Sequence, residues 1–152
     1  MGRRAVAFVT VLFLLTAGAA GVFAQGKGFG AGAIFGEPTG VSLKYWLTRT
    51  TAVDAGLAWS FKSPGFFHIH ADYLWHFRNE INSTEQFVPY LGVGGRIGFS
   101  SSTRVGARMV GGIGWWPHNV PLDIFAEVAP ILDLVPKTEF SLEGGIGLRY
   151  FF

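Results

Sequence analysis

Apolar and polar residues alternate in the last segment of the chain, which reads GGIGLRYFF (144–152). Four large apolar side chains occupy every second position there: Ile146, Leu148, Tyr150 and Phe152. A period of two is that of a β-strand with two unlike faces, because successive side chains point to opposite sides of a sheet. The pattern therefore predicts a sheet with one apolar face.

The same alternation recurs along the chain in segments of about ten residues, separated by turn-rich sequences. One face of these segments is apolar and uncharged, and the other face carries the charges and many of the 22 glycines. This predicts an all-β fold, an eight-stranded antiparallel up-and-down barrel. The predicted strands are Gly28–Gly36, Val41–Leu47, Ala52–Phe61, His68–Phe77, Phe87–Phe99, Thr103–Trp115, Pro121–Leu134 and Glu139–Phe152.

Two kinds of barrel fit this pattern. In a soluble ligand-carrying barrel the apolar face lines the inside, whereas in a transmembrane barrel it contacts lipid. Only 14% of the residues are charged and 16% are aromatic, with aromatic residues crowded at the strand ends. Glycine on the charged face makes room inside a narrow barrel, and a closed barrel satisfies every backbone hydrogen bond in lipid. These features favour the transmembrane barrel.

The first 24 residues have the pattern of a cleaved signal peptide. Arg3 and Arg4 precede a short apolar core, and Val22-Phe23-Ala24 fits a small-residue cleavage site. We predict a signal peptide over 1–24 and a barrel over 25–152; an uncleaved anchor is disfavoured because the core is short. Removing the two arginines leaves ten basic and ten acidic residues, a balance that gives no indication of a nucleic-acid partner.

Charged residues on the inward face are the main candidate site. An eight-stranded barrel is just wide enough for side chains to fill, and buried ions must be paired. We predict a salt-bridged plug, with Arg108, Glu127 and Glu143 as its central cluster; the alternative is a narrow ion path gated by rearrangement of these pairs. The predicted interior network comprises Lys44, Asp54, His70, Asp72, Arg96, Arg108, Asp123, Glu127, Glu143 and Arg149.

Among the segments of the chain, HIHADYLWH (68–76) is the strongest candidate for a metal-binding site. His68, His70 and Asp72 share one face, and two histidines at this spacing can bind one zinc ion. The alternative, which we favour, is that they join the interior polar network, so we predict no metal and no cofactor. The chain has no phosphate-binding glycine motif and no His-x-Ser pairing of the kind expected in outer-membrane lipid hydrolases, and we predict no enzyme.

The GGIGLRYFF ending resembles the C-terminal signature of bacterial outer-membrane barrels. This resemblance implies that the barrel-assembly machinery reads Ile146, Leu148, Tyr150 and Phe152 as an assembly signal. Residues 25–152 resemble the small eight-stranded barrels typified by the OmpA membrane domain and OmpX. The stretches GEPTGVSLKYWL and APILDLVP are similar to small single-barrel outer-membrane proteins without an assigned function. The resemblance implies an integral protein surrounded by outer-membrane lipid, with both termini periplasmic.

With that orientation, the four outward connections EPTG, KSPG, SSS and VPKT are short, and the longest, RNEINSTEQ, is periplasmic. Adhesion barrels similar to OmpX have long outer loops, which weakens an adhesin assignment. We predict a closed barrel with a structural or binding role. The alternatives are a narrow channel for ions or small solutes, and a surface protein that binds a ligand or adheres through exposed loop residues such as Phe66 and Phe67.

Overall fold

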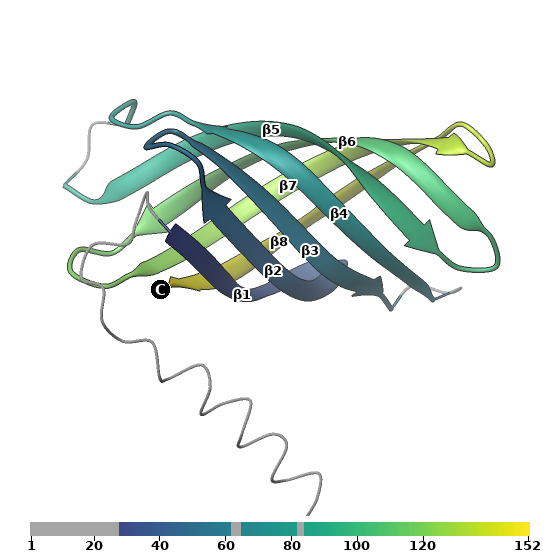
Figure 1. Ribbon diagram of the computed structural model, residues 1–152, viewed down its shortest axis with the longest axis horizontal. Coiled ribbons are helices and arrows are strands. Elements are labelled where there is room, and N and C mark those ends of the chain that lie inside the picture. The colour runs from purple at the N-terminus through teal and green to yellow at the C-terminus, as the bar shows by residue number, and fades with distance from the viewer. Residues whose placement is uncertain (1–27, 62–64, 82–83) are drawn as a thin grey trace, which may run out of the picture.

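The chain forms a closed barrel of eight antiparallel strands, each paired with the next in sequence (Figure 1). The structure, a computed structural model, describes residues 28–61, 65–81 and 84–152. The predicted up-and-down barrel is confirmed, and the predicted signal peptide lies outside the described residues. The strands are β1 (Gly28–Glu37), β2 (Thr39–Trp46), β3 (Thr51–Ser60), β4 (Phe66–His76), β5 (Gln86–Phe99), β6 (Thr103–Trp116), β7 (Leu122–Val135) and β8 (Glu139–Phe151). No helix within the described ranges is long and apolar enough to cross a bilayer.

The barrel closes where β1 pairs with β8. Ala31 lies opposite Tyr150 and Ala33 lies opposite Leu148. Phe152 extends the closure, because its backbone N–H donates to the Phe29 carbonyl at 2.9 Å and the two rings stack with centroids 6.5 Å apart. The alternating C-terminal segment is therefore the closing strand, and it removes the unpaired edges that an open sheet would have.

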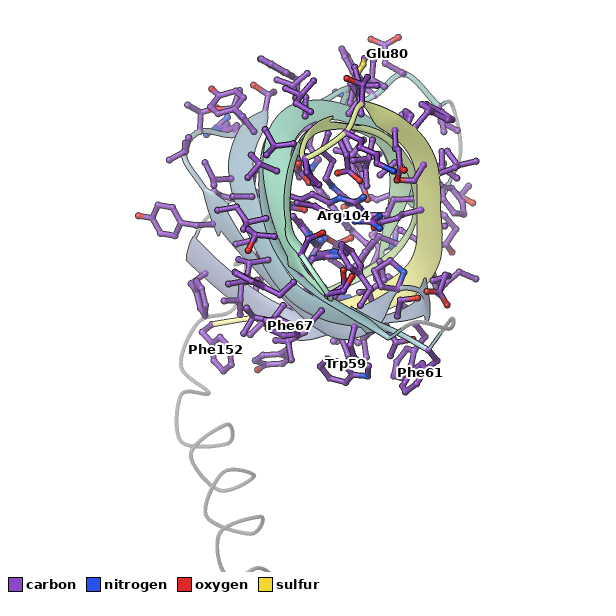
Figure 2. All side chains as sticks on the ribbon, turned by 90° about the vertical axis from the view of Figure 1, so that its right-hand side faces the viewer. Trp59, Phe61, Phe67, Glu80, Arg104 and Phe152 are labelled. Carbon is purple, nitrogen blue, oxygen red and sulfur yellow. The ribbon has the colours of Figure 1, made fainter. Side chains whose placement is uncertain are left out.

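Strand alternation decides which side chains face outward. The outer face is apolar on every strand, with exposed side chains from Phe29 on β1 to Ile146 on β8. Figure 2, which looks along the barrel, shows Trp59, Phe61 and Phe67 pointing away from it, while other side chains fill the interior. The charged residues of the predicted interior network are buried or nearly buried. The phase of the alternation predicted from the sequence is thus the phase of the folded strands.

Two strand boundaries at one end of the barrel differ from the prediction. The predicted turn EPTG (37–40) is mostly strand, because β1 runs to Glu37 and β2 starts at Thr39, whose hydroxyl donates to the Gly36 carbonyl at 3.0 Å. Similarly, β4 begins at Phe66 rather than at His68. The alternation then directs Phe66 to the same side as His68, into the barrel.

Glycines on the inward face leave the space that large side chains occupy. A Cβ on Gly112 would lie 2.4 Å from Cζ of the Tyr90 ring and 2.7 Å from the Ala126 carbonyl oxygen. The next glycine, Gly111, faces outward, and its Cβ would meet only Leu91 Cδ2, at 3.4 Å. Two adjacent glycines of β6 thus have opposite steric surroundings.

We expect Gly112→Ala to lower the free energy of unfolding by about 1–3 kcal/mol, because an added methyl group in a filled interior forces its neighbours to shift. Gly111→Ala is the matched control and should be close to neutral. Urea unfolding of the refolded barrel in lipid vesicles, followed by tryptophan fluorescence, measures both. Equal effects of the two substitutions would contradict the inward placement of Gly112.

Candidate functional site in the barrel interior

Arg108 on β6 holds three carboxylates in the middle of the barrel. Its Nε donates to Asp72 at 2.8 Å, its Nη1 to Glu143 at 2.9 Å and its Nη2 to Glu127 at 3.2 Å. These partners come from β4, β8 and β7, so one guanidinium links four strands across the lumen. The structure brings together the predicted cluster of Arg108, Glu127 and Glu143, and Asp72 joins it.

Arg149 on β8 forms a second centre, nearer the end of the barrel that holds the C-terminus. It donates to Asp123 and to Asp54, each at 3.2 Å. Lys44 donates to the same Asp123 oxygen at 3.2 Å. The Arg149 guanidinium also lies 3.7 Å from the centroid of the Phe125 ring, which shields it from solvent. Four members of the predicted network therefore meet at this level.

Arg96 on β5 forms a third centre, nearer the opposite mouth. It donates to Asp133 through Nε at 3.2 Å and through Nη2 at 2.7 Å, and it also pairs with Glu143. Glu143 thereby connects this centre to Arg108. Arg104 lies beyond it and is 35% exposed, with its Nη1 3.6 Å from Glu139 and 4.0 Å from Asp133. Figure 2 shows Arg104 inside the mouth.

We call Arg96, Arg108 and Arg149 the three arginine hubs. Each is at most 4% exposed, and each has at least two acidic partners on other strands. Bidentate and multiple hydrogen bonds are what make a buried guanidinium tolerable, because desolvation alone costs several kcal/mol per ion. The hubs therefore tie distant strands together across the lumen.

The histidines lie beside this network. His70 Nδ1 is 3.4 Å from His68 Nε2, and His68 Nδ1 is 3.6 Å from Glu143 Oε1. His70 approaches Asp54 and Asp72 with a ligand atom, whereas His68 is directed toward Glu143. The three residues considered for zinc from the sequence, His68, His70 and Asp72, thus do not converge as a single group.

Several interior partners were absent from the predicted network. Tyr90 donates to Glu127 at 2.7 Å, and Ser42 accepts a hydrogen bond from Arg149 at 2.9 Å. Asp133, the bidentate partner of Arg96, was predicted to be an inward-facing acid but was not named in the network. All three share the inward phase of their strands, so the alternation contained the signal. The alternation does not predict which inward residues contact each other, because those contacts depend on the stagger between strands.

The position of Phe66 differs from the one predicted. We predicted from the sequence that Phe66 and Phe67 are exposed loop residues. Both lie in β4, and the Phe66 ring points inward, 5.1 Å from the Arg96 guanidinium and above Gly98, whose Cβ would lie 2.2 Å from it. Phe67 faces outward and stacks on Phe99 with ring centroids 6.2 Å apart. The early start of β4 explains the difference.

Both mouths of the barrel are hollowed. The mouth near Arg104 has a depression of about 250 Å³, lined by residues that include Phe66, Arg96 and Ser141. The opposite mouth has one of about 150 Å³, lined in part by Arg78 and Trp116. Between them, beside His70 and Arg108, is a cavity of about 20 Å³. This volume is comparable to the space needed by one water molecule.

No protein-family model and no curated protein sequence matches the chain. Solved structures do match it. The N-terminal β-barrel domain of OprF from Pseudomonas aeruginosa aligns with a TM-score of 0.66 at 16% identity, covering 83% of this chain and 98% of that domain. Neisserial surface protein A (NspA) aligns with a TM-score of 0.55 at 19% identity, covering 82% of this chain and 94% of that protein.

The chain has the fold of these barrels. The predicted resemblance to small eight-stranded outer-membrane barrels is thereby confirmed for the architecture. At these identities the likeness concerns the fold alone.

We expect Arg108→Ala to lower the free energy of unfolding by about 3–5 kcal/mol or to prevent refolding, because it leaves buried carboxylates without a counter-charge. Arg104→Ala, on the same strand but partly exposed, should cost only about 0–1 kcal/mol. The heat-dependent shift in electrophoretic mobility, recorded across a urea series, measures both variants. A similar loss for the two substitutions would show that the hub does not stabilise the barrel.

Proposed function

We propose that the protein is an integral outer-membrane barrel with a sealed, salt-bridged interior and a structural or binding role without catalysis. The observation that carries the proposal is the stack of three arginine hubs across the lumen. An eight-stranded barrel is only wide enough to hold its own side chains, so ion-paired arginines of this size leave little room for a solute path. The cavity of about 20 Å³ between the two mouths agrees with this.

The apolar outer face supports the membrane location. Outward residues such as Leu91 and Met109, near the middle of their strands, are 57% and 62% exposed. A soluble barrel with this surface would present a continuous apolar patch to water, whereas lipid accommodates it. The fold shared with OprF and NspA supports the same location. We further propose that both termini are periplasmic, so that the mouth near Arg104 faces outward.

A planar-bilayer recording tests the sealed interior. Refolded wild-type protein, with folding checked by the heat-dependent gel shift, should give no discrete conductance steps, because the hubs obstruct the lumen. Arg96→Gln removes the positive charge and keeps a polar, although shorter, side chain, and it serves as the comparison for charge. Conductance steps in the wild type whose ion selectivity changes in Arg96→Gln would overturn the sealed-barrel proposal in favour of a narrow channel.

We also propose that Ile146, Leu148, Tyr150 and Phe152 form the signal read by the barrel-assembly machinery. Their outward, alternating arrangement on the closing strand supports this proposal, because it leaves these side chains accessible to a partner before closure. Phe152 contributes little to the buried interior, so its importance for assembly should exceed its importance for stability.

We expect Phe152→Ala to reduce the amount of protein in the outer-membrane fraction severalfold, with little change in the urea midpoint of the barrel refolded in vitro. Phe140→Ala is the matched control, since Phe140 also faces outward on β8 but lies at its other end. Cell fractionation followed by the gel shift measures both. Equal outer-membrane levels for the two variants would contradict an assembly signal at the C-terminus.

A further inference from the structure

Asp54 on β3 and His70 and Asp72 on β4 converge in the lumen. One ligand atom from each lies within 4.8 Å of the others. From this geometry we infer a binding site for a divalent transition-metal ion, of which zinc is the representative. The site goes beyond the proposed function and does not depend on whether the barrel is sealed. It also revises our prediction from the sequence that the interior binds no metal.

Two carboxylates face each other directly at this site. Asp54 and Asp72 are opposite partners in the β3–β4 register, and each is 2% exposed. Like charges opposite each other on adjacent strands are destabilising unless something neutralises them. A cation between the two side chains would turn this repulsion into shared coordination.

Each of these carboxylates has one committed oxygen and one free oxygen. Asp54 Oδ2 accepts from Arg149, and Asp72 Oδ2 accepts from Arg108. Asp54 Oδ1 and Asp72 Oδ1 are buried and have no hydrogen-bond partner. A buried polar atom without a partner costs about 1–3 kcal/mol and calls for an explanation such as an ion. The arginines therefore orient the carboxylates and leave an oxygen of each available as a ligand.

The balance of charges among the interior ion pairs also favours a bound cation. Among the described residues, four basic and six acidic side chains form its buried or nearly buried ion pairs, and at the rim Arg104 is offset by Glu139. Within these ion pairs the acidic groups outnumber the basic ones by two, a charge that one divalent cation would offset; Arg78, at the opposite mouth, is outside this count. The basic residues are Lys44, Arg96, Arg108 and Arg149, and the acidic ones are Asp54, Asp72, Asp123, Glu127, Asp133 and Glu143.

Glycines on the neighbouring strands make room for the ligands. Gly56 lies opposite His70, and its Cβ would be 2.8 Å from His70 Nε2. Gly94 lies opposite Asp72, and its Cβ would be 2.3 Å from Asp72 Oδ1. Glycine at these two positions thus leaves the space that the His70 ring and the Asp72 carboxylate occupy.

The ligand set suits a transition metal. Imidazole nitrogen and carboxylate oxygen are both zinc ligands, and water can supply a fourth position. His70 Nδ1 interacts with His68 Nε2 at 3.4 Å, which leaves His70 Nε2 for the ion. Zinc ligands are about 3.3 Å apart, so the three side chains must close slightly around the ion.

Refolding the barrel with Zn²⁺ or Co²⁺ tests the site. After desalting, elemental analysis should give about one metal ion per folded wild-type chain, and Co²⁺ should give visible d–d absorption bands. His70→Gln removes a ligand but no charge, so the barrel should still fold, with metal affinity at least about tenfold weaker. His76→Gln is the matched control, because His76 is an equally inward histidine of β4 outside the trio; it should bind metal as the wild type does.

Two results would overturn the inference. One is the absence of bound metal in folded wild-type protein, with urea midpoints that are the same in Zn²⁺ and in EDTA; a proton shared by Asp54 and Asp72 would then be the neutralising group. The other is metal binding that is unchanged in His70→Gln, which would assign the ion to a different place. Neither result bears on the conductance test, so the two proposals fail separately.

Discussion

Pairing of charges in a lumen too narrow for bulk water is the interaction on which this barrel depends. An eight-stranded barrel must fill its interior with side chains, and this chain fills it with arginines and carboxylates. Each of the three hubs, Arg96, Arg108 and Arg149, pairs with at least two acidic groups from other strands. Removing one partner would leave the others as buried charges without a counter-ion. Substitutions within the network are therefore expected to be destabilising.

The outer and inner faces of the barrel place different steric limits on their side chains, and glycine makes the crowded inner face possible. Outside, large apolar side chains can vary, since lipid places few shape constraints on them. Inside, each large residue requires a small one beside it, as Tyr90 requires Gly112 and His70 requires Gly56. The high glycine content is therefore a steric consequence of placing guanidinium groups and aromatic rings within one narrow cylinder. The size of each interior side chain and the charge it carries are therefore constrained by the same neighbours.

The sequence was sufficient to predict the strands, their order and the side each residue faces, because a period of two is a local property of the chain. It also brought Arg108, Glu127 and Glu143 into one group. It could not predict that Asp133 pairs with Arg96 or that Tyr90 reaches Glu127, because those contacts depend on the stagger of strands and on side-chain reach across the lumen. Phe66 was misplaced because β4 begins two residues earlier than predicted, at Phe66 rather than at His68.

Closure of β8 on β1 has a consequence for how the barrel forms. Arg149, on the closing strand, bonds to Ser42 and Asp54, which lie 107 and 95 residues earlier in the chain. A sheet that contains every strand except β8 would hold Asp54 and Asp123 beside Lys44 alone, with much of their charge uncompensated. Such an intermediate gains little from its partial structure, so these contacts favour a cooperative, all-or-none transition whose rate is limited by contacts between remote segments.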